Sequence, residues 1–163
     1  MLTIIAALAT NRAIGISGHL IYHISQDLRR FKALTTGHTV IMGRRTFESL
    51  PKGALPNRRN IVLTRKSSNE YSGAERFSSL QQALASCSPD EEIFVIGGES
   101  VYEEALHIAD RLCLTHIKAQ PKFADAFFPP FNEDEWQLLS SESHEADENN
   151  EFPFVFADYV RIK

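Results

Sequence analysis

Four short apolar runs constrain the fold of this chain more than any other feature of its sequence. Polar side chains scarcely interrupt these runs, which occupy Thr3–Ala9, Thr39–Met42, Asn60–Thr64 and Ile93–Ile96. Such runs are typical of strands that are buried on both faces of a parallel sheet. Patterns typical of short amphipathic helices occur between or after them, at Ser25–Leu34, Arg44–Leu50, Ser78–Ser86 and Glu99–Ile108. Three more strands are predicted without helices between them, at Arg111–Ile117, Trp136–Ser140 and Phe154–Ile162.

This order of elements predicts an α/β fold. We expect a mostly parallel twisted sheet with an antiparallel C-terminal edge strand, and helices on both faces. A chain of 163 residues suggests one domain with a core of useful size, so we expect a single domain over residues 1–163. Its core should include the lone tryptophan, Trp136. Loops are predicted at Thr10–Ile24, Lys52–Arg59 and Lys66–Gly73, and within the acidic run Glu142–Glu151.

Charge and cysteine content exclude several classes of function. The formal net charge of −4 provides no general attraction for nucleic acid or for an anionic membrane. Cys87 and Cys113 imply no disulfide framework, so a reducing compartment such as the cytoplasm fits best. The apolar N-terminal run is too short to span a bilayer and lacks a basic leader, which favours a strand over a signal peptide. Nothing in the sequence demands more than a monomer.

Asp27 occupies an unusual place for an acidic side chain. Ser25 is predicted to cap the helix Ser25–Leu34, and Asp27 then shares one helical face with Phe31 and Leu34. Burial without a cationic partner would raise the pKa of this carboxyl, which could then hold and deliver a proton near neutral pH. The alternative is that Asp27 only complements the helix dipole in the first turn.

Two strand–turn–helix junctions indicate a nucleotide site. In Val40–Phe47 and in Phe94–Tyr102 a buried strand ends in glycine and a helix begins at once. Glycine lets a ligand approach the backbone closely, and a helix N-terminus offers free N–H groups to a phosphate. Arg44 and Arg45 add positive charge at the first junction, and Arg65 follows the third strand. Together they predict a site for a phosphorylated dinucleotide, although each junction alone could be a simple tight turn.

Other chemistries find little support. His19 and His23 have the spacing of zinc-binding histidines, but Leu20 stands where the glutamate of an H-E-x-x-H motif would be. Neither cysteine has a partner at metal-ligand spacing, and the G-x-S-x-G motif of serine hydrolases is missing. We therefore expect no metal.

Six segments of the chain follow one family in order and spacing. They are IIAALATNRAIG (Ile4–Gly15), DLRRFK (Asp27–Lys32), VIMGRRTFESLP (Val40–Pro51), LPNRRNIVLTR (Leu55–Arg65), VIGGESVY (Val95–Tyr102) and LTHI (Leu114–Ile117). Together they resemble a bacterial-type dihydrofolate reductase over essentially the whole chain. The resemblance implies NADPH-dependent reduction of 7,8-dihydrofolate to tetrahydrofolate, with hydride passing from nicotinamide C4 to pterin C6 while N5 gains a proton. It also implies that antifolate inhibitors bind the chain.

The resemblance assigns roles around the folate. Asp27 would be the sole ionisable group in the pterin pocket, and Thr115 is similar to the threonine that hydrogen-bonds this acid. Tyr22 would complete the catalytic group with its hydroxyl. Arg58 resembles the arginine that pairs with the glutamate α-carboxylate, whereas without the family it would be a solvated turn arginine. The residues expected to bind substrate are Ile5, Ala7, Asp27, Leu28, Phe31, Leu50, Lys52, Leu55, Arg58, Ile96 and Thr115.

The resemblance also places NADPH on the two glycine junctions. Thr64 and Arg65 would lie at its 2′-phosphate, which favours NADPH over NADH, and the Gly97–Gly98 peptide bond is cis in the family. The residues expected to bind cofactor are Ala7, Ile14, Gly15, Gly18, His19, Leu20, Gly43, Arg44, Arg45, Thr46, Leu63, Thr64, Arg65, Ile96, Gly97, Gly98, Glu99, Ser100, Val101 and Tyr102.

The chain departs from common family residues at a few positions. Ile21 and Tyr22 replace a frequent Pro-Trp pair in the lid, and Leu20 replaces a frequent methionine. Arg45 replaces a frequent histidine and should strengthen phosphate contact, whereas Ser100 occupies a position that is often basic. Two alternatives stay open: a related pterin or pyrimidine reductase on the same scaffold, and a non-catalytic pterin- or nucleotide-binding module.

Overall fold

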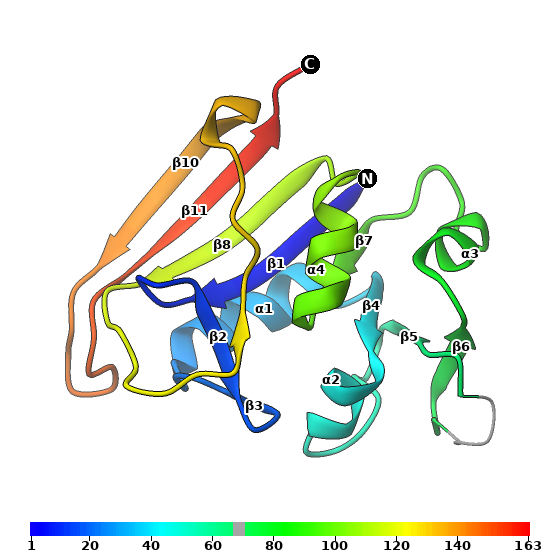
Figure 1. The fold of residues 1–163 in the computed structure, drawn as a ribbon, viewed down its shortest axis with the longest axis horizontal. Helices are drawn as coiled ribbons and strands as arrows, with labels where there is room; N and C mark the ends of the chain where they lie inside the picture. Colours follow the sequence, from blue (N-terminus) through cyan, green and yellow to red (C-terminus); the bar gives the residue numbers. More distant parts are fainter. Residues whose placement is uncertain (67–70) are drawn as a thin grey trace.

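A central eight-stranded sheet organises the computed structural model, which describes residues 1–66 and 71–163 (Figure 1). Its strand order is β10-β11-β8-β1-β7-β4-β5-β6. These strands are β1 Leu2–Leu8, β4 Thr39–Gly43, β5 Arg59–Leu63, β6 Ala74–Phe77, β7 Ile93–Val95, β8 Arg111–Ile117, β10 Trp136–His144 and β11 Phe154–Arg161. The helices are α1 Ser25–Thr35, α2 Arg44–Ser49, α3 Leu80–Ala85, α4 Glu99–Leu106 and the 3-10 turn η1 Glu133–Glu135.

The strand directions confirm the predicted fold class. The strands from β8 through β6 in the sheet order pair in parallel. The C-terminal strand β11 runs antiparallel to both of its neighbours, β8 and β10. β11 therefore lies one position inside the sheet, and β10 forms the edge.

Alternate residues of each strand bury opposite faces of the sheet, as the pleat of a strand requires. Ile4 and Ile41 face the cluster that α3 and α4 cover, and Ile5 and Val40 face the cluster that contains residues of α1 and α2. Figure 1 shows α4 in front of the sheet and α1 behind it. Helices on both faces are thus confirmed, and Trp136 lies in the core as expected, at 5% exposure.

A second, three-stranded sheet replaces much of the loop predicted at Thr10–Ile24. Its order is β3-β2-β9, with β2 at Ala13–Ile16, β3 at His19–Leu20 and β9 at Ala126–Phe127. Asp125, just before β9, accepts a hydrogen bond from the Ser17 N–H at 2.9 Å. The loop prediction was wrong because β9, a partner of β2, is distant in the sequence and too short to show a pattern of its own. Strand β6 was not predicted either, since its sequence, AERF, is half charged.

Several predicted boundaries need correction. Ser25 is not the N-cap of α1, because the buried Ile24 occupies that position and no side-chain cap is formed. Helix α4 ends at Leu106, so Ile108 is 49% exposed and the buried Ala109 takes the inner position. Strand β10 extends to His144 through its pairing with β11, which shortens the acidic loop.

The helix predicted at Ser78–Ser86 is confirmed as α3, Leu80–Ala85. The Ser79 hydroxyl caps α3 by accepting from the Gln82 N–H at 3.1 Å. Half of the loop predicted at Lys66–Gly73, residues 67–70, lies outside the described residues. Among the described residues, no helix has both the length and the apolar composition that crossing a membrane requires.

Candidate active site

The carboxyl of Asp27 projects from α1 toward β8, where it meets a buried hydroxyl. Thr115 Oγ1 donates a hydrogen bond to Asp27 Oδ1 at 2.5 Å, and Thr115 is only 2% exposed. Burial raises the pKa of Asp27, and the Thr115 hydrogen bond and the positive charge of Arg30 offset part of that rise. The prediction of a carboxyl with a raised pKa is therefore confirmed, although Arg30 is a cationic neighbour that the sequence reasoning did not count.

The two glycine junctions meet across adjacent strands. The Gly43 N–H donates to the Gly97 carbonyl at 2.8 Å, which ties the end of β4 to the turn after β7. Gly97 has a φ of +116°, and a Cβ there would lie 3.2 Å from the ring of Tyr102. The Tyr102 hydroxyl is itself fixed, because it donates to the Ile5 carbonyl at 2.8 Å. The Gly97–Gly98 peptide bond is cis, as the resemblance implied.

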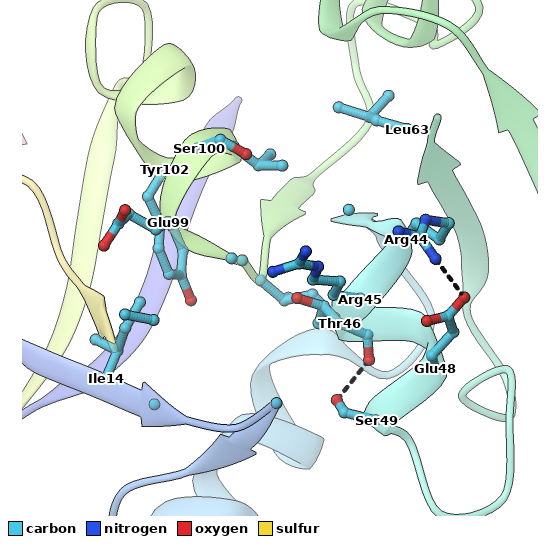
Figure 2. Close-up of a pocket in the computed structure, with 18 of the residues that line it drawn as sticks. Ile14, Arg44, Arg45, Thr46, Glu48, Ser49, Leu63, Glu99, Ser100 and Tyr102 are labelled. Atoms are coloured by element: carbon cyan, nitrogen blue, oxygen red, sulfur yellow. Dashed lines mark hydrogen bonds and ion pairs between the residues drawn. The ribbon is translucent and has the colours of Figure 1, made fainter. Parts of the chain in front are cut away.

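A groove of about 1160 Å³ opens above these junctions (Figure 2). Every residue predicted above to bind the cofactor lines it, from Ala7 and Ile14 on one side to Leu63 and Arg65 on the other. Figure 2 shows Arg45 and Thr46 of α2 near the centre of the view, with Glu99 and Ser100 of α4 on one side and Arg44 on the other. The structure thus brings together residues that the sequence scatters over about a hundred positions.

Sequence reasoning missed several residues of the groove wall. They are Ser17, Glu48, Ser49, Ser78, Ser79, Leu80, Glu104, Asp125 and Ala126. Ser78 and Ser79 directly follow β6, at the strand end where ligands bind in open α/β sheets. Recognition of β6 as a strand would have pointed to them.

The groove has features that suit a phosphorylated dinucleotide, although four carboxylate side chains also line it. Glycines at the junctions leave backbone accessible, and the first turn of α4 supplies free N–H groups. Arg45 and Arg65 are exposed beside it, whereas Arg44 is held by Glu48 at 3.0 Å. Glu99 lies at the same helix start, and its carboxylate accepts from the Phe127 N–H at 2.6 Å.

An apolar cluster between α1 and the sheet contains five of the eleven predicted substrate residues. Ile5 is among its buried members, and Phe31, Leu50, Leu55 and Ile96 are partly buried against it. Leu28 is half-buried on α1, and Lys52 is exposed on the turn after α2. Ala7 and Tyr22 belong instead to a neighbouring cluster with Phe154 and Phe156.

Arg58 is positioned by neighbouring oxygen atoms and is not a freely solvated turn residue. Its Nε donates to the Pro56 carbonyl at 2.9 Å, and its Nη1 donates to Thr35 Oγ1 at 3.0 Å. Thr35 in turn donates to the Phe31 carbonyl at 2.8 Å. Burial lowers the pKa of the guanidinium, but it stays charged near neutral pH. Among the described residues no carboxylate pairs with Arg58, so its remaining N–H groups can take an acidic ligand.

Comparisons with known proteins decide the family. A family model described as dihydrofolate reductase matches residues 1–161. The chain belongs to the dihydrofolate reductase family. It is 43% identical to the dihydrofolate reductase of Bacillus subtilis, over 99% of this chain and 95% of that relative. It is 44% identical to dihydrofolate reductase type 3 of Salmonella typhimurium, over 99% of this chain and 98% of that relative.

A solved structure of the family shares the fold. The dihydrofolate reductase from Enterococcus faecalis, complexed with NADP(H) and RAB-propyl, superimposes with a TM-score of 0.93 at 31% identity. The match covers 100% of this chain and 97% of that chain.

Tyr22, the predicted replacement for a dihydrofolate reductase lid tryptophan, packs against Phe152. The centroids of the two rings are 5.0 Å apart and the rings are tilted by 59°. Burial, and then the charge of Glu151, raise the pKa of the Tyr22 hydroxyl. The hydroxyl is therefore neutral near neutral pH and can donate a hydrogen bond. Among the described residues, no group of three or more histidine, cysteine or acidic side chains is placed to hold a metal ion.

Asp27→Asn is expected to stabilise this dihydrofolate reductase at neutral pH. The folded-state pKa of Asp27 is raised above its ordinary value of 3.8, so the ionised carboxyl opposes folding. The favourable contribution of the Asp27 side chain to the free energy of unfolding is complete below pH 3.8, where the carboxyl is protonated. This contribution is lost as the pH rises through the folded-state pKa. Asparagine cannot ionise, and its carbonyl oxygen can still accept from Thr115.

Thermal melts from acidic to neutral pH measure this effect. The melting temperatures of variant and wild type should converge as the pH falls toward 3.8 and separate in favour of the variant at neutral pH. Asp110→Asn is the matched control, because it removes an exposed carboxylate that also accepts a backbone hydrogen bond. An Asp27→Asn variant that melts below wild type at neutral pH would show that the charge is not costly.

Proposed function

We propose that the chain reduces 7,8-dihydrofolate to tetrahydrofolate with NADPH, with Asp27 handling the proton that N5 gains. The observation that carries this proposal is the partly buried Asp27–Thr115 pair beside a groove with features that suit a phosphorylated dinucleotide. The activity follows from membership of the dihydrofolate reductase family. The roles of individual residues are our inference from the family resemblance, supported by the contacts described above.

The reaction needs one hydride and one proton on adjacent atoms of the pterin. When bound, the reduced nicotinamide supplies the hydride to C6. Asp27 hydrogen-bonds the amino-pyrimidine edge of the pterin and delivers the proton that ends on N5, and Thr115 holds the carboxyl in place for this transfer. Ile5 and Ile96 wall the pocket and exclude water, which keeps the proton affinity of the carboxyl high.

The remaining residues bind and orient. Phe31, Leu50 and Leu55 enclose the apolar middle of the folate, and Arg58 pairs with its glutamate α-carboxylate. Arg45 and the first turn of α4 hold the pyrophosphate, while Thr64 and Arg65 hold the 2′-phosphate. Leu28, Lys52 and Tyr22 complete the substrate side.

We also propose the setting in which the chain works. Its partners are dihydrofolate and antifolates, and neither nucleic acid nor membrane takes part, because the net charge of −4 attracts neither. The proposed reaction uses residues of one chain only, so a monomer suffices. We propose the cytoplasm because the two cysteines, Cys87 and Cys113, fit a reducing compartment.

Arg58→Met tests the proposed substrate. Loss of a charged, positioned donor pair should raise the KM for dihydrofolate by about ten- to a hundredfold, because hydrogen bonds to charged groups contribute roughly 1.5–3 kcal/mol. The kcat should change little, since the α-carboxylate is remote from the reacting atoms. The measurement is the loss of reduced-nicotinamide absorbance on addition of dihydrofolate.

Two controls keep this test specific. Arg29→Met, at an exposed arginine of α1, should leave the KM unchanged. A dihydropterin without the glutamate should bind wild type and Arg58→Met equally. Turnover of dihydrofolate that is indifferent to Arg58 would favour a reductase for another pterin or pyrimidine, and absence of NADPH oxidation by wild type would favour a binding module.

A further inference from the structure

We propose that Asp158 is a positioning residue for the reaction: by binding Arg30 it holds that guanidinium against β11 and prevents it from pairing with Asp27. The inference rests on the proposed role of Asp27 as the proton-handling group. It concerns residues of this chain on the side of α1 that faces the C-terminal strands.

The Arg30 guanidinium is held from two directions. Its Nη2 donates to both carboxylate oxygens of Asp158, at 2.8 and 3.1 Å. Its central carbon lies 4.5 Å from the centroid of the Phe156 ring, which is the geometry of a cation–π contact. Ser140 Oγ donates to Asp158 Oδ2 at 3.1 Å and steadies the carboxylate from β10. Both partners are partly buried, with side-chain exposures of 22% and 33%.

This assembly borders the Asp27–Thr115 pair. Arg30 follows Asp27 by three residues on α1, a spacing at which helical side chains are neighbours. In the register of β8 with β11, Phe156 lies opposite Thr115 and Asp158 lies opposite Cys113. The guanidinium therefore sits where it can pair with Asp158 or turn toward Asp27.

Three titratable groups on the elements around Asp27 are neutral near neutral pH. Burial, and then the charge of Asp27, raise the pKa of Tyr102 on α4, while burial and Glu151 raise the pKa of Tyr22 before α1. On β8, burial and Asp158 raise the pKa of Cys113 to about 12. Among the described residues, Arg30 is the cation whose charge acts on the Asp27 carboxyl.

The ion pair with Asp158 partly neutralises the charge of Arg30. It therefore sets how far that charge lowers the pKa of Asp27. A guanidinium that pairs directly with an aspartate lowers its pKa by about one to three pH units. Such a pair would abolish the advantage that burial gives Asp27 as a proton donor near neutral pH. Asp158 prevents this because its carboxylate already accepts two hydrogen bonds from the guanidinium, at 2.8 and 3.1 Å.

Asp158→Asn tests the proposal, since asparagine keeps the shape and a hydrogen-bond acceptor but cannot neutralise Arg30. The titration midpoint of Asp27, followed by carbon-13 NMR of its carboxyl carbon in the full chain, should fall by about one pH unit. The signal is assigned by its loss in Asp27→Asn. The pH profile of single-turnover hydride transfer should shift to lower pH equally, which means a roughly tenfold slower rate above the inflection and an unchanged rate well below it.

Reciprocal and control variants complete the experiment. Arg30→Met should move the midpoint upward, and the double variant Arg30→Met/Asp158→Asn should cancel the shift caused by Asp158→Asn alone. Glu75→Gln is the matched control, because it breaks an arginine–carboxylate pair of 2.6 and 3.0 Å on distant strands and should leave the midpoint unchanged. Should Asp158→Asn not fold, Asp158→Ser, which also removes the negative charge, takes its place and should lower the midpoint in the same way.

A midpoint that stays in place in Asp158→Asn, or rates that fall equally at every pH, would overturn the proposal and leave Asp158 a structural residue. Failure of the underlying function looks different. In that case the pH profile of wild type would show no inflection that Asp27→Asn removes, whatever the NMR midpoint does.

Discussion

Replacing Asp27 by asparagine is expected to slow hydride transfer at neutral pH by roughly a hundred- to ten-thousandfold, the range typical of a lost general acid. The variant keeps the hydrogen bond from Thr115 and the shape of the pocket, but it has no proton to deliver near neutral pH. NADPH affinity should be preserved, because Asp27 is not among the residues that line the cofactor groove.

The raised pKa of Asp27 also predicts the direction in which the rate of hydride transfer changes with pH. Burial raises the pKa of Asp27, so the wild-type rate should fall as the pH rises through that value, and this inflection should vanish in the variant. Activity of the variant should return in part at low pH, where the substrate is protonated before it binds. The measurement is single-turnover absorbance with NADPH-saturated protein. Asp110→Asn should behave as wild type, and a fully active Asp27→Asn at neutral pH would remove Asp27 from the mechanism.

Gly97→Ala is expected to reduce NADPH affinity by about a hundredfold or more and to cost roughly 1–3 kcal/mol of stability, the usual cost of a strained backbone position. At a φ of +116° an alanine is strained, and its Cβ would lie 3.2 Å from the Tyr102 ring. Tyr102 cannot move away freely, because its hydroxyl is bonded to the Ile5 carbonyl. The clash must therefore shift the junction that forms the floor of the groove.

Gly37→Ala is the control that separates the effect of backbone strain on stability from the effect of a shifted junction on NADPH affinity. Gly37 also has a positive φ, +86°, but nothing lies within 4 Å of a Cβ placed there. It should lose stability without losing NADPH affinity. Calorimetric titration with NADPH and thermal melts of both variants make the comparison. Equal NADPH affinities in Gly97→Ala and Gly37→Ala would show that the junction does not shape the cofactor site.

Sequence patterns predicted the long strands and helices because apolar runs and helical periodicity can be read from neighbouring residues. The apolar run of β1 and the glycine at the end of β4 need no distant partner to be recognised. The face shared by Asp27 and Phe31 follows from helical spacing alone. By contrast, β6 is half charged and β9 has only two residues, so neither shows a pattern, and their identity depends on the strands that pair with them.

The family resemblance predicted more of the site residues than residue spacing alone could. Every predicted cofactor residue lines one groove, and the predicted hydrogen bond between Thr115 and Asp27 is present. The roles of Arg58 and Tyr22 stay predictions, but the structure adds their supports, Thr35 for the first and Phe152 for the second. Neither contact has a signature in the sequence.

The sequence by itself determined that this chain forms a mostly parallel α/β sheet, that two of its strands end in glycine before a helix and that an acid lies on an apolar helical face. Each of these depends on the order and periodicity of neighbouring residues. Only the tertiary structure decided three contacts: the hydrogen bond from Thr115 to Asp27, the backbone hydrogen bond from Gly43 to Gly97, and the ion pair between Arg30 and Asp158. These contacts join residues far apart in the chain, and burial and electrostatics act through distance in space, which a one-dimensional pattern does not contain.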